Sequence, residues 1–273
     1  MCLIVFDWRP AASHGPLFTL AANRDEYFRR ATEPLGWWGA AQRVLAGRDL
    51  AGGGTWLGLS RDGRFAALTN YRAPLEVRPD APTRGTLVSG YLAAPALAPL
   101  DYLAEVAERG AAYNGFNLLV GDFSRRELAW YCNRSSAAPK LLEAGVHGIS
   151  NAVLDTPWPK LTRKRAELGA LVGEGQTPPL AALIEVMRDT RVARDEELPE
   201  TGIGIERERV LSAAFIEMPE YGTRGTTALR VRAQGTRLAV DIAERSDDDG
   251  SHRLTRPGNV ERVFSFDIER GNA

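Results

Sequence analysis

The chain begins Met1-Cys2-Leu3-Ile4-Val5-Phe6-Asp7, in which a cysteine is followed directly by a short run of apolar residues. A run of this length, rich in branched and aromatic side chains, predicts a buried strand over Leu3–Asp7. If Met1 is removed, Cys2 carries a thiol and a free α-amine, and such an amine titrates at about 7.7–8.0, where it can accept the thiol proton. The alternative is a structural cysteine, because free cysteine is among the most buried residue types.

A second predicted strand, Leu17–Asn23, runs into the polar stretch Asn23-Arg24-Asp25-Glu26. We expect this stretch in the loop beyond the strand, where rigid scaffolds often place functional groups. Pairing of the two strands would bring Cys2 near Arg24, which could lower the pKa of the thiol, and near Asp25, which could hold the α-amine. A surface turn with a weak ion pair would show the same pattern.

The later strands are predicted on both sides of a central helical block. They are Thr55–Ser60, Phe65–Asn70, Phe116–Gly121, Leu128–Asn133, Val146–Asn151, Thr226–Arg232, Arg237–Arg245 and Val260–Ile268. The predicted helices are Arg84–Leu92, Asp101–Ala112, Pro159–Val172 and Leu180–Met187. This order argues against βαβ alternation and favours antiparallel sheets with segregated helices, an α+β class. We expect residues 1–273 to form one domain.

Composition excludes several classes of function. With a formal net charge of −1, the chain has no overall field that would favour nucleic acid or an anionic membrane. No apolar stretch is long enough to span a bilayer, and no secretory signal is present. Two cysteines make no disulfide framework, so we expect a reducing, cytoplasmic setting. The three histidines show no metal-ligand spacing, and we expect neither a metal nor a cofactor.

Three further polar residues follow or precede predicted strands. Asn70 and Asn151 each end a strand, and their amide groups suit an oxyanion hole, although an Asn at a strand end is often a simple turn residue. Arg224 lies in the glycine-rich stretch 221–227, expected as a loop, and could clamp a carboxylate or phosphate. The acidic run Asp247–Asp249 is expected to be a solvated turn.

These motifs resemble, in order along the chain, the NRDE family, that of transport and Golgi organisation protein 2. The resemblance rests on the Met-Cys start and on the segments 23–26, 53–58, 67–71, 84–85, 113–118, 148–152, 156–160 and 221–224. That family is similar to the N-terminal-nucleophile hydrolases, especially bile-salt and penicillin V acylases. The resemblance therefore implies a four-layer αββα sandwich with two antiparallel sheets between helical layers.

The resemblance also implies roles for individual residues. Cys2 would be the nucleophile, and Arg24 with Asp25 would correspond to an arginine and aspartate pair that is not adjacent in the acylases. Asn151 resembles the oxyanion asparagine of the acylases, Asn70 a second donor, and Arg224 their late active-site arginine. Further side chains are expected to contact the substrate; these are Asn23, Glu26, Trp56, Tyr71 and Trp158.

Two functions follow from these expectations. The first is an amidohydrolase or acyl transferase, in which Cys2 attacks an amide or thioester. The second is a non-catalytic carrier, because the family is associated with lipid homeostasis, acyl-CoA binding and haem trafficking. In the carrier, Arg24, Glu26 and Arg224 would hold an anionic head group, and Cys2 could be a soft ligand. In both cases the partner is a small acyl or haem-like molecule.

Overall fold

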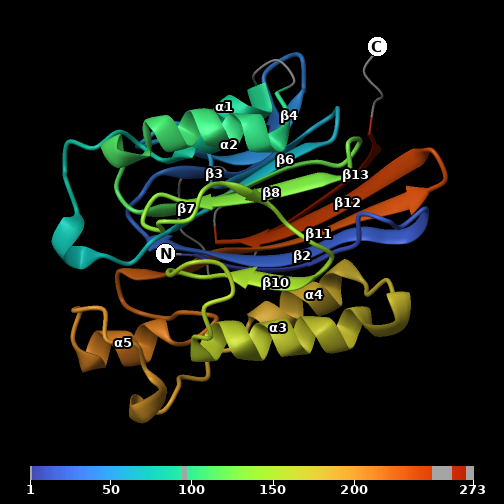
Figure 1. Ribbon diagram of the computed structural model, residues 1–273. Helices are drawn as coiled ribbons and strands as arrows, with labels where there is room; N and C mark the ends of the chain where they lie inside the picture. Colours follow the sequence, from blue (N-terminus) through green and yellow to red (C-terminus); the bar gives the residue numbers. More distant parts are fainter. Residues whose placement is uncertain (1, 94–96, 248–259, 269–273) are drawn as a thin grey trace.

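The computed structural model describes residues 2–93, 97–247 and 260–268, and its strands form two antiparallel sheets (Figure 1). The first sheet has the order β10-β1-β2-β11-β12-β13, and its strands are β1 (Cys2–Trp8), β2 (His14–Tyr27), β10 (Gly145–Ile149), β11 (Tyr221–Gln234), β12 (Arg237–Ser246) and β13 (Val260–Asp267). The second runs β3-β4-β5-β6-β7-β8-β9, with β3 (Thr32–Trp38), β4 (Val44–Asp49), β5 (Leu57–Ser60), β6 (Arg64–Asn70), β7 (Phe116–Asp122), β8 (Glu127–Cys132) and β9 (Lys140–Leu141).

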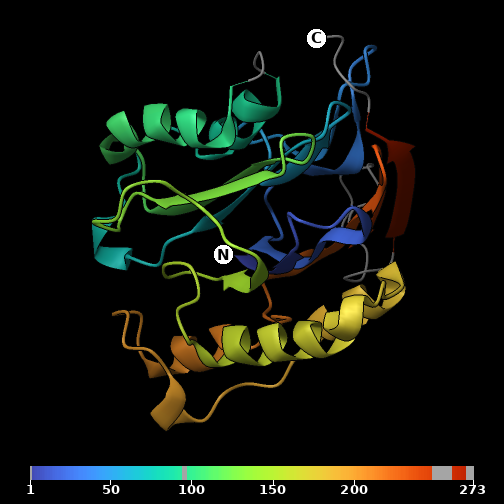
Figure 2. The same cartoon turned by 45° about the vertical axis from the view of Figure 1, so that its right-hand side comes forward.

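Helices cover the outer face of each sheet, so the expected four-layer αββα sandwich is confirmed (Figure 2). Helices α1 (Gly85–Ala93) and α2 (Pro99–Glu108) pack on the second sheet. Helices α3 (Pro159–Val172) and α4 (Leu180–Met187) pack on the first, and the short α5 (Ile205–Leu211) follows them along the chain. Three apolar cores therefore form, one between the sheets and one beneath each helical layer.

The alternation along β1 decides which way Cys2 faces. Leu3 and Val5 belong to the core beneath α3 and α4, whereas Ile4 and Phe6 belong to the core between the sheets. Because successive side chains in a strand point to opposite faces, Cys2 shares the inter-sheet face with Ile4 and Phe6.

Two segments expected as loops are strands. Strand β2 continues to Tyr27, so Asn23–Glu26 lies inside it, and β11 begins at Tyr221 and pairs with this end of β2. The buried polar side chains there satisfy one another across the ladder: Thr226 Oγ1 donates to Asn23 Oδ1 and Thr223 Oγ1 donates to Asp25 Oδ1, each at 2.7 Å. These side chains thus form hydrogen bonds across the strands in place of the bonds to water that they would form in an exposed loop. Strands β3, β4 and β9 and helix α5 had no predicted counterpart.

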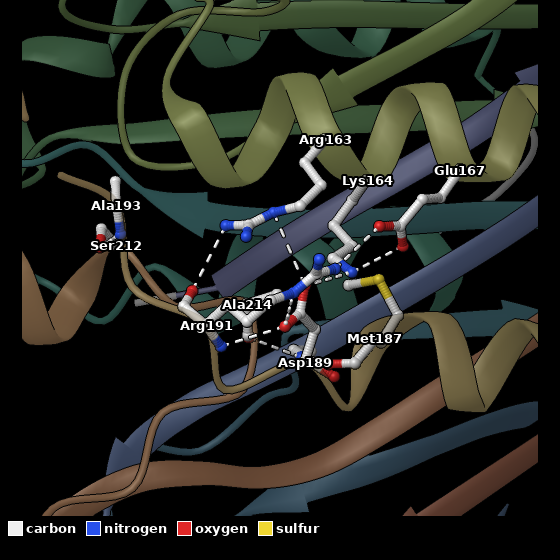
Figure 3. Close-up of polar contacts among 10 residues, drawn as sticks. Arg163, Lys164, Glu167, Met187, Asp189, Arg191, Ala193, Ser212 and Ala214 are labelled. Atoms are coloured by element: carbon white, nitrogen blue, oxygen red, sulfur yellow. Dashed lines mark hydrogen bonds and ion pairs between the residues drawn. The ribbon is translucent and has the colours of Figure 1, made fainter. Parts of the chain in front are cut away.

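Asn23 ties β2 to the helical layer beneath it. Its Nδ2 donates to the carbonyls of Met187 at 2.8 Å and Ala214 at 2.7 Å. Beside these carbonyls lies a buried ion-pair cluster, in which Lys164 of α3 contacts Asp189, just beyond α4, at 2.8 Å (Figure 3). In the described part of the chain, no helix is long and apolar enough to cross a membrane.

The glycine-rich segment after β4 touches the first turn of α1. Gly54 has φ +78°, and a Cβ built there would lie 2.4 Å from the carbonyl carbon and oxygen of Gly85. The amide of Thr55 also donates to the Gly85 carbonyl, at 3.2 Å. Gly53 has φ +70°, but its missing Cβ faces open space. Of these two glycines, only Gly54 therefore needs glycine for two reasons, a left-handed backbone and a close approach.

Replacing Gly54 by Ala is expected to lower the free energy of unfolding by about 3 kcal/mol, since left-handed strain and a backbone clash add together. The matched variant Gly53→Ala should lose only about 1 kcal/mol, from the strain alone. Urea denaturation of both variants measures this. Equal losses in the two variants would show that the contact with Gly85 relaxes without cost.

Candidate functional site

The pairing of β1 with β2 places Cys2 directly opposite Arg24. Directly opposed residues of an antiparallel pair have Cβ atoms about 4.5–5.5 Å apart, so the thiol and the root of the arginine are neighbours on the inter-sheet face. Asp25, one residue on, is paired with Thr223 of β11 and is buried. The sequence-based expectation that these strands bring Cys2, Arg24 and Asp25 together agrees with this register.

A cavity of about 370 Å³ opens at this point, between the ends of β1 and β2 and the segment that leads into α1. Seven of the predicted site residues line it: Cys2, Arg24, Asp25, Glu26, Trp56, Asn70 and Arg224. Its volume falls within the range of small-molecule sites. Cys2 is 8% exposed, which leaves its thiol at the wall of this cavity rather than on the outer surface.

Burial and charge act in opposite directions on the two central groups. Burial raises the pKa of the Cys2 thiol, the Asp25 carboxylate raises it further, and the Arg24 cation lowers it. Burial also raises the pKa of Asp25, whereas Lys160, Arg24 and the hydrogen bond from Thr223 lower it. The resting thiol is therefore protonated at neutral pH, and a nucleophilic role requires a base beside it.

Two of the five arginines that line the cavity make no ion pair with any described residue. Arg30 pairs with Asp49 at 2.6 Å, Arg224 with Asp247 at 3.0 Å, and Arg48 lies 4.0 Å from Glu33. The remaining two are Arg24, which forms no hydrogen bond to a described residue, and Arg84, whose Nη1 donates to the Gly115 carbonyl at 2.8 Å. These two cations therefore remain available to an anionic ligand. Arg84 lies in the motif 84–85 of the sequence analysis, which assigns it no role in the site.

Arg224 occupies a β-bulge in the ladder between β11 and β2, which redirects its side chain. Its guanidinium donates to Asp247 and to the carbonyls of Tyr27 and Arg30, so it fixes the turn between β2 and β3. Asp247 is only 2% exposed, so at this position the expected solvated turn is wrong; Asp248 and Asp249 lie outside the described residues. The bulge, rather than a glycine-rich loop, explains the position of Arg224.

The two asparagines are joined by a hydrogen bond, and this bond links the two sheets. Asn151 is fully buried, and its Nδ2 donates at 3.0 Å to the backbone carbonyl of Asn70, whose own side chain lines the cavity. Around them, Thr69 Oγ1 donates to the Ser150 carbonyl at 2.6 Å, and the Arg72 amide donates to the Asn151 carbonyl at 2.7 Å. The side chain of Asn70 makes no hydrogen bond to another described residue.

Four predicted residues lie outside the cavity lining. They are Asn151, Asn23, whose amide is bound to backbone carbonyls, Tyr71, which packs against the inter-sheet core, and Trp158, whose ring lies 4.8 Å from the Arg72 guanidinium. Within the described residues, no group of three or more potential metal ligands occurs.

Lys160, in the first turn of α3, is a candidate that the sequence analysis missed. It is 1% exposed, and its Nζ has no hydrogen-bond partner in the described part of the chain. Burial lowers the pKa of Lys160 to about 8, against the opposing effects of Asp25 and Cys2. The sequence pointed to Lys160 only through the motif 156–160, and that segment is equally typical of the start of a helix.

Comparison with known proteins shows the family of the chain. A family model described as Transport and Golgi organisation 2 matches residues 1–248. The chain belongs to that family. The human Transport and Golgi organization protein 2 homolog is 37% identical over 273 residues, covering 94% of this chain and 97% of the relative. The Drosophila melanogaster family member is 29% identical over 257 residues, covering 86% and 89%. The resemblance found in the motifs is thus confirmed.

Solved structures of two hydrolases are also similar. A C2A mutant conjugated bile acid hydrolase from Clostridium perfringens has 9% identity and a TM-score of 0.49, covering 100% of this chain and 94% of the other. A Caenorhabditis elegans N-acylethanolamine-hydrolyzing acid amidase ortholog has 10% identity and a TM-score of 0.45, covering 84% and 92%.

Arg24→Gln is expected to slow alkylation of Cys2 by iodoacetamide at every pH below the plateau, because the pKa of the thiol rises further when the opposing cation is lost. The measurement is the rate of adduct formation against pH, by mass spectrometry of the peptide that contains Cys2. Arg48→Gln is the matched control, since Arg48 lines the same cavity but stacks on Trp38. Identical profiles for Arg24→Gln and the unmodified protein would contradict the assigned effect of Arg24.

Proposed function

We propose that this site transfers or hydrolyses acyl groups, with Cys2 as the nucleophile acting on a thioester or an amide. The observation that carries the proposal is the position of the Cys2 thiol, at the wall of a cavity of about 370 Å³ and opposite Arg24, which forms no ion pair with a described residue. Thiols are strong nucleophiles once ionised, and an acyl-enzyme divides a difficult displacement into two easier steps.

The base in this proposal is the α-amine of Cys2 itself, which requires removal of Met1, a residue outside the described ranges. Sγ attacks the carbonyl carbon while the amine takes the thiol proton. The tetrahedral intermediate collapses to an S-acyl enzyme, and the ammonium returns the proton to the departing thiol or amine. Water then attacks the thioester, the amine accepts a proton from the water, and the thiol and the carboxylic acid are released. This route suits a thiol whose pKa burial raises.

Asn70 is the donor that supports the oxyanion in this scheme. Its side chain lines the cavity, whereas the Asn151 amide is used to hold the Asn70 backbone. A donor fixed before the reaction lowers the barrier without reorganisation, and loss of one such donor typically costs about 10²–10³ in rate. Asn151 would thus contribute by positioning Asn70.

Two of the arginines in the cavity wall suit a substrate with an anionic leaving group. Arg24 and Arg84 are the lining arginines that form no ion pair with a described carboxylate, and guanidinium groups bind phosphate and carboxylate through paired hydrogen bonds. Trp56 offers an apolar wall beside them. An acyl-CoA thioester combines an electrophilic carbonyl, an apolar chain and phosphate groups, and so matches these three features.

Mixing the protein with short-, medium- and long-chain acyl-CoA thioesters should give an intact mass that lacks methionine and carries one acyl group. Cys2→Ala should abolish the adduct, because no other residue supplies both the thiol and the amine. Cys132→Ala is the matched control and should keep the adduct, since Cys132 lies in the inter-sheet core. Retention of methionine together with absence of any adduct would refute the catalytic function.

A carrier function remains the second candidate, because Arg24 and Arg84 can hold an anionic head group without help from the thiol. Here an acyl-CoA, another lipid or haem would be bound and released unchanged, with Cys2 as a soft ligand in the haem case. A carrier and a hydrolase would share the cavity and differ only in the role of Cys2.

For the carrier, titration calorimetry with palmitoyl-CoA should show binding that survives Cys2→Ala and falls about tenfold or more with Arg24→Ala, since a buried charged contact is lost. Arg48→Ala, at the same cavity, should bind nearly as well as the unmodified protein. Binding that does not change in Arg24→Ala would count against this function.

A further inference from the structure

Two buried lysines lie one turn apart on helix α3, and they differ in one respect. Lys160 and Lys164 are each 1% exposed. Lys164 Nζ lies 2.7 Å from Glu167 and 2.8 Å from Asp189, a fully paired arrangement (Figure 3). Lys160 Nζ has no hydrogen-bond partner among the residues that the structure describes. Since an unpaired buried ammonium costs several kcal/mol, Lys160 is not explained by packing alone.

Composition sharpens this contrast. Only three of the 34 basic residues of the chain are lysines, so arginine is used at nearly every other basic position. The two side chains differ chemically in that lysine loses its proton readily when buried, whereas arginine stays charged. A lysine at this buried position, where no described residue bonds to its Nζ, therefore indicates a role for a compact positive charge that can be lost by deprotonation.

Helix α3 packs on β1, and the groups that act electrostatically on Lys160 come from both sheets and from α5. They are Cys2 of β1, Asp25 of β2, Arg72 after β6, Glu208 of α5 and, acting on the same carboxylate and thiol, Tyr221 of β11. Arg72 and Glu208 form a buried ion pair with each other, and Glu208 also accepts from the Thr201 amide at 3.0 Å. That pair is internally balanced, which leaves Asp25 and Cys2 as the groups that Lys160 balances.

We propose that Lys160 is a positioning residue for the Cys2 site, whose buried ammonium holds Asp25 as a carboxylate and favours the thiolate of Cys2. This rests on the proposed function of Cys2 as a nucleophile. Lys160 acts through Asp25 and the local field and need not touch the substrate, because it does not line the cavity.

The titration of Lys160 fits this role. Burial lowers the pKa of Lys160 to about 8, close to the range in which the α-amine of a processed Cys2 titrates. Groups that interact this closely lose their protons in shared steps. The charge that stabilises the thiolate would therefore fall as pH rises, and ionisation of Cys2 would spread over a wider pH interval than a single isolated thiol shows.

The test is the pH profile of Cys2 alkylation by iodoacetamide in a Cys132→Ala background, followed by intact mass, with thiolate absorbance as a second readout. Lys160→Met should slow alkylation at neutral pH about tenfold, since removal of a nearby cation raises a buried thiol pKa. Lys160→Arg should restore the rate of alkylation at neutral pH to that of the parent. Its rate–pH curve should narrow to the width of a single-proton titration, because the charge of arginine persists at all pH values. Lys160→Gln serves as a second neutral variant if Lys160→Met does not fold.

Lys164→Met is the matched control: the same residue type on the same helix, whose loss should lower stability but leave the Cys2 profile unchanged. Superimposable profiles for Lys160→Met and the parent, or an equal shift in Lys164→Met, would overturn the assignment. No acyl substrate enters this experiment. A shifted profile here, together with no adduct in the separate acyl-CoA experiment, would therefore contradict the proposed function while supporting the role of Lys160.

Discussion

The register between β1 and β2 is the constraint on which the rest of the site depends. It is set by alternation, because Leu3 and Val5 must face the helices while Ile4 and Phe6 must face the other sheet. A slip of one residue would reverse every side chain of β1, so the apolar pattern fixes the register far more firmly than any polar contact could. The placement of Cys2 opposite Arg24 follows from that packing requirement.

Strand β2 extends this control to the other groups. It pairs with β1 on one side and β11 on the other, and it carries Asn23, Arg24 and Asp25 in succession. The odd-numbered members bury their side chains and hydrogen-bond to Thr226 and Thr223 of β11. Arg24 forms no hydrogen bond to a described residue, and it lines the cavity together with Asp25. One strand thus carries both the polar residues that bond to β11 and the residues that line the candidate site.

Sequence reasoning found the strands whose apolar residues alternate or run together, and the β1–β2 pairing that it considered is present. The four-layer architecture was implied by the family resemblance. Sequence reasoning missed β3 and β4 because Pro34, Gly36 and Gly47 interrupt them and mimic turns. It placed Asn23–Glu26 and Tyr221–Gly225 in loops because the partners that satisfy these polar residues are about 200 positions away. Lys160 escaped notice because a lysine in the first turn of a helix is ordinarily solvated, and only the packed structure shows its burial.

The hydrogen bonds that join Asn151 to Asn70, Thr69 to Ser150 and Arg72 to Asn151 have a mechanical consequence. They join the ends of β6 and β10, one strand from each sheet, and so they hold the two sheets together beside the cavity. Widening the cavity by separating the two sheets at this end would break these hydrogen bonds. The segment 73–84, which bears no regular strand or α-helix and supplies part of the wall, lies outside this hydrogen-bonded junction.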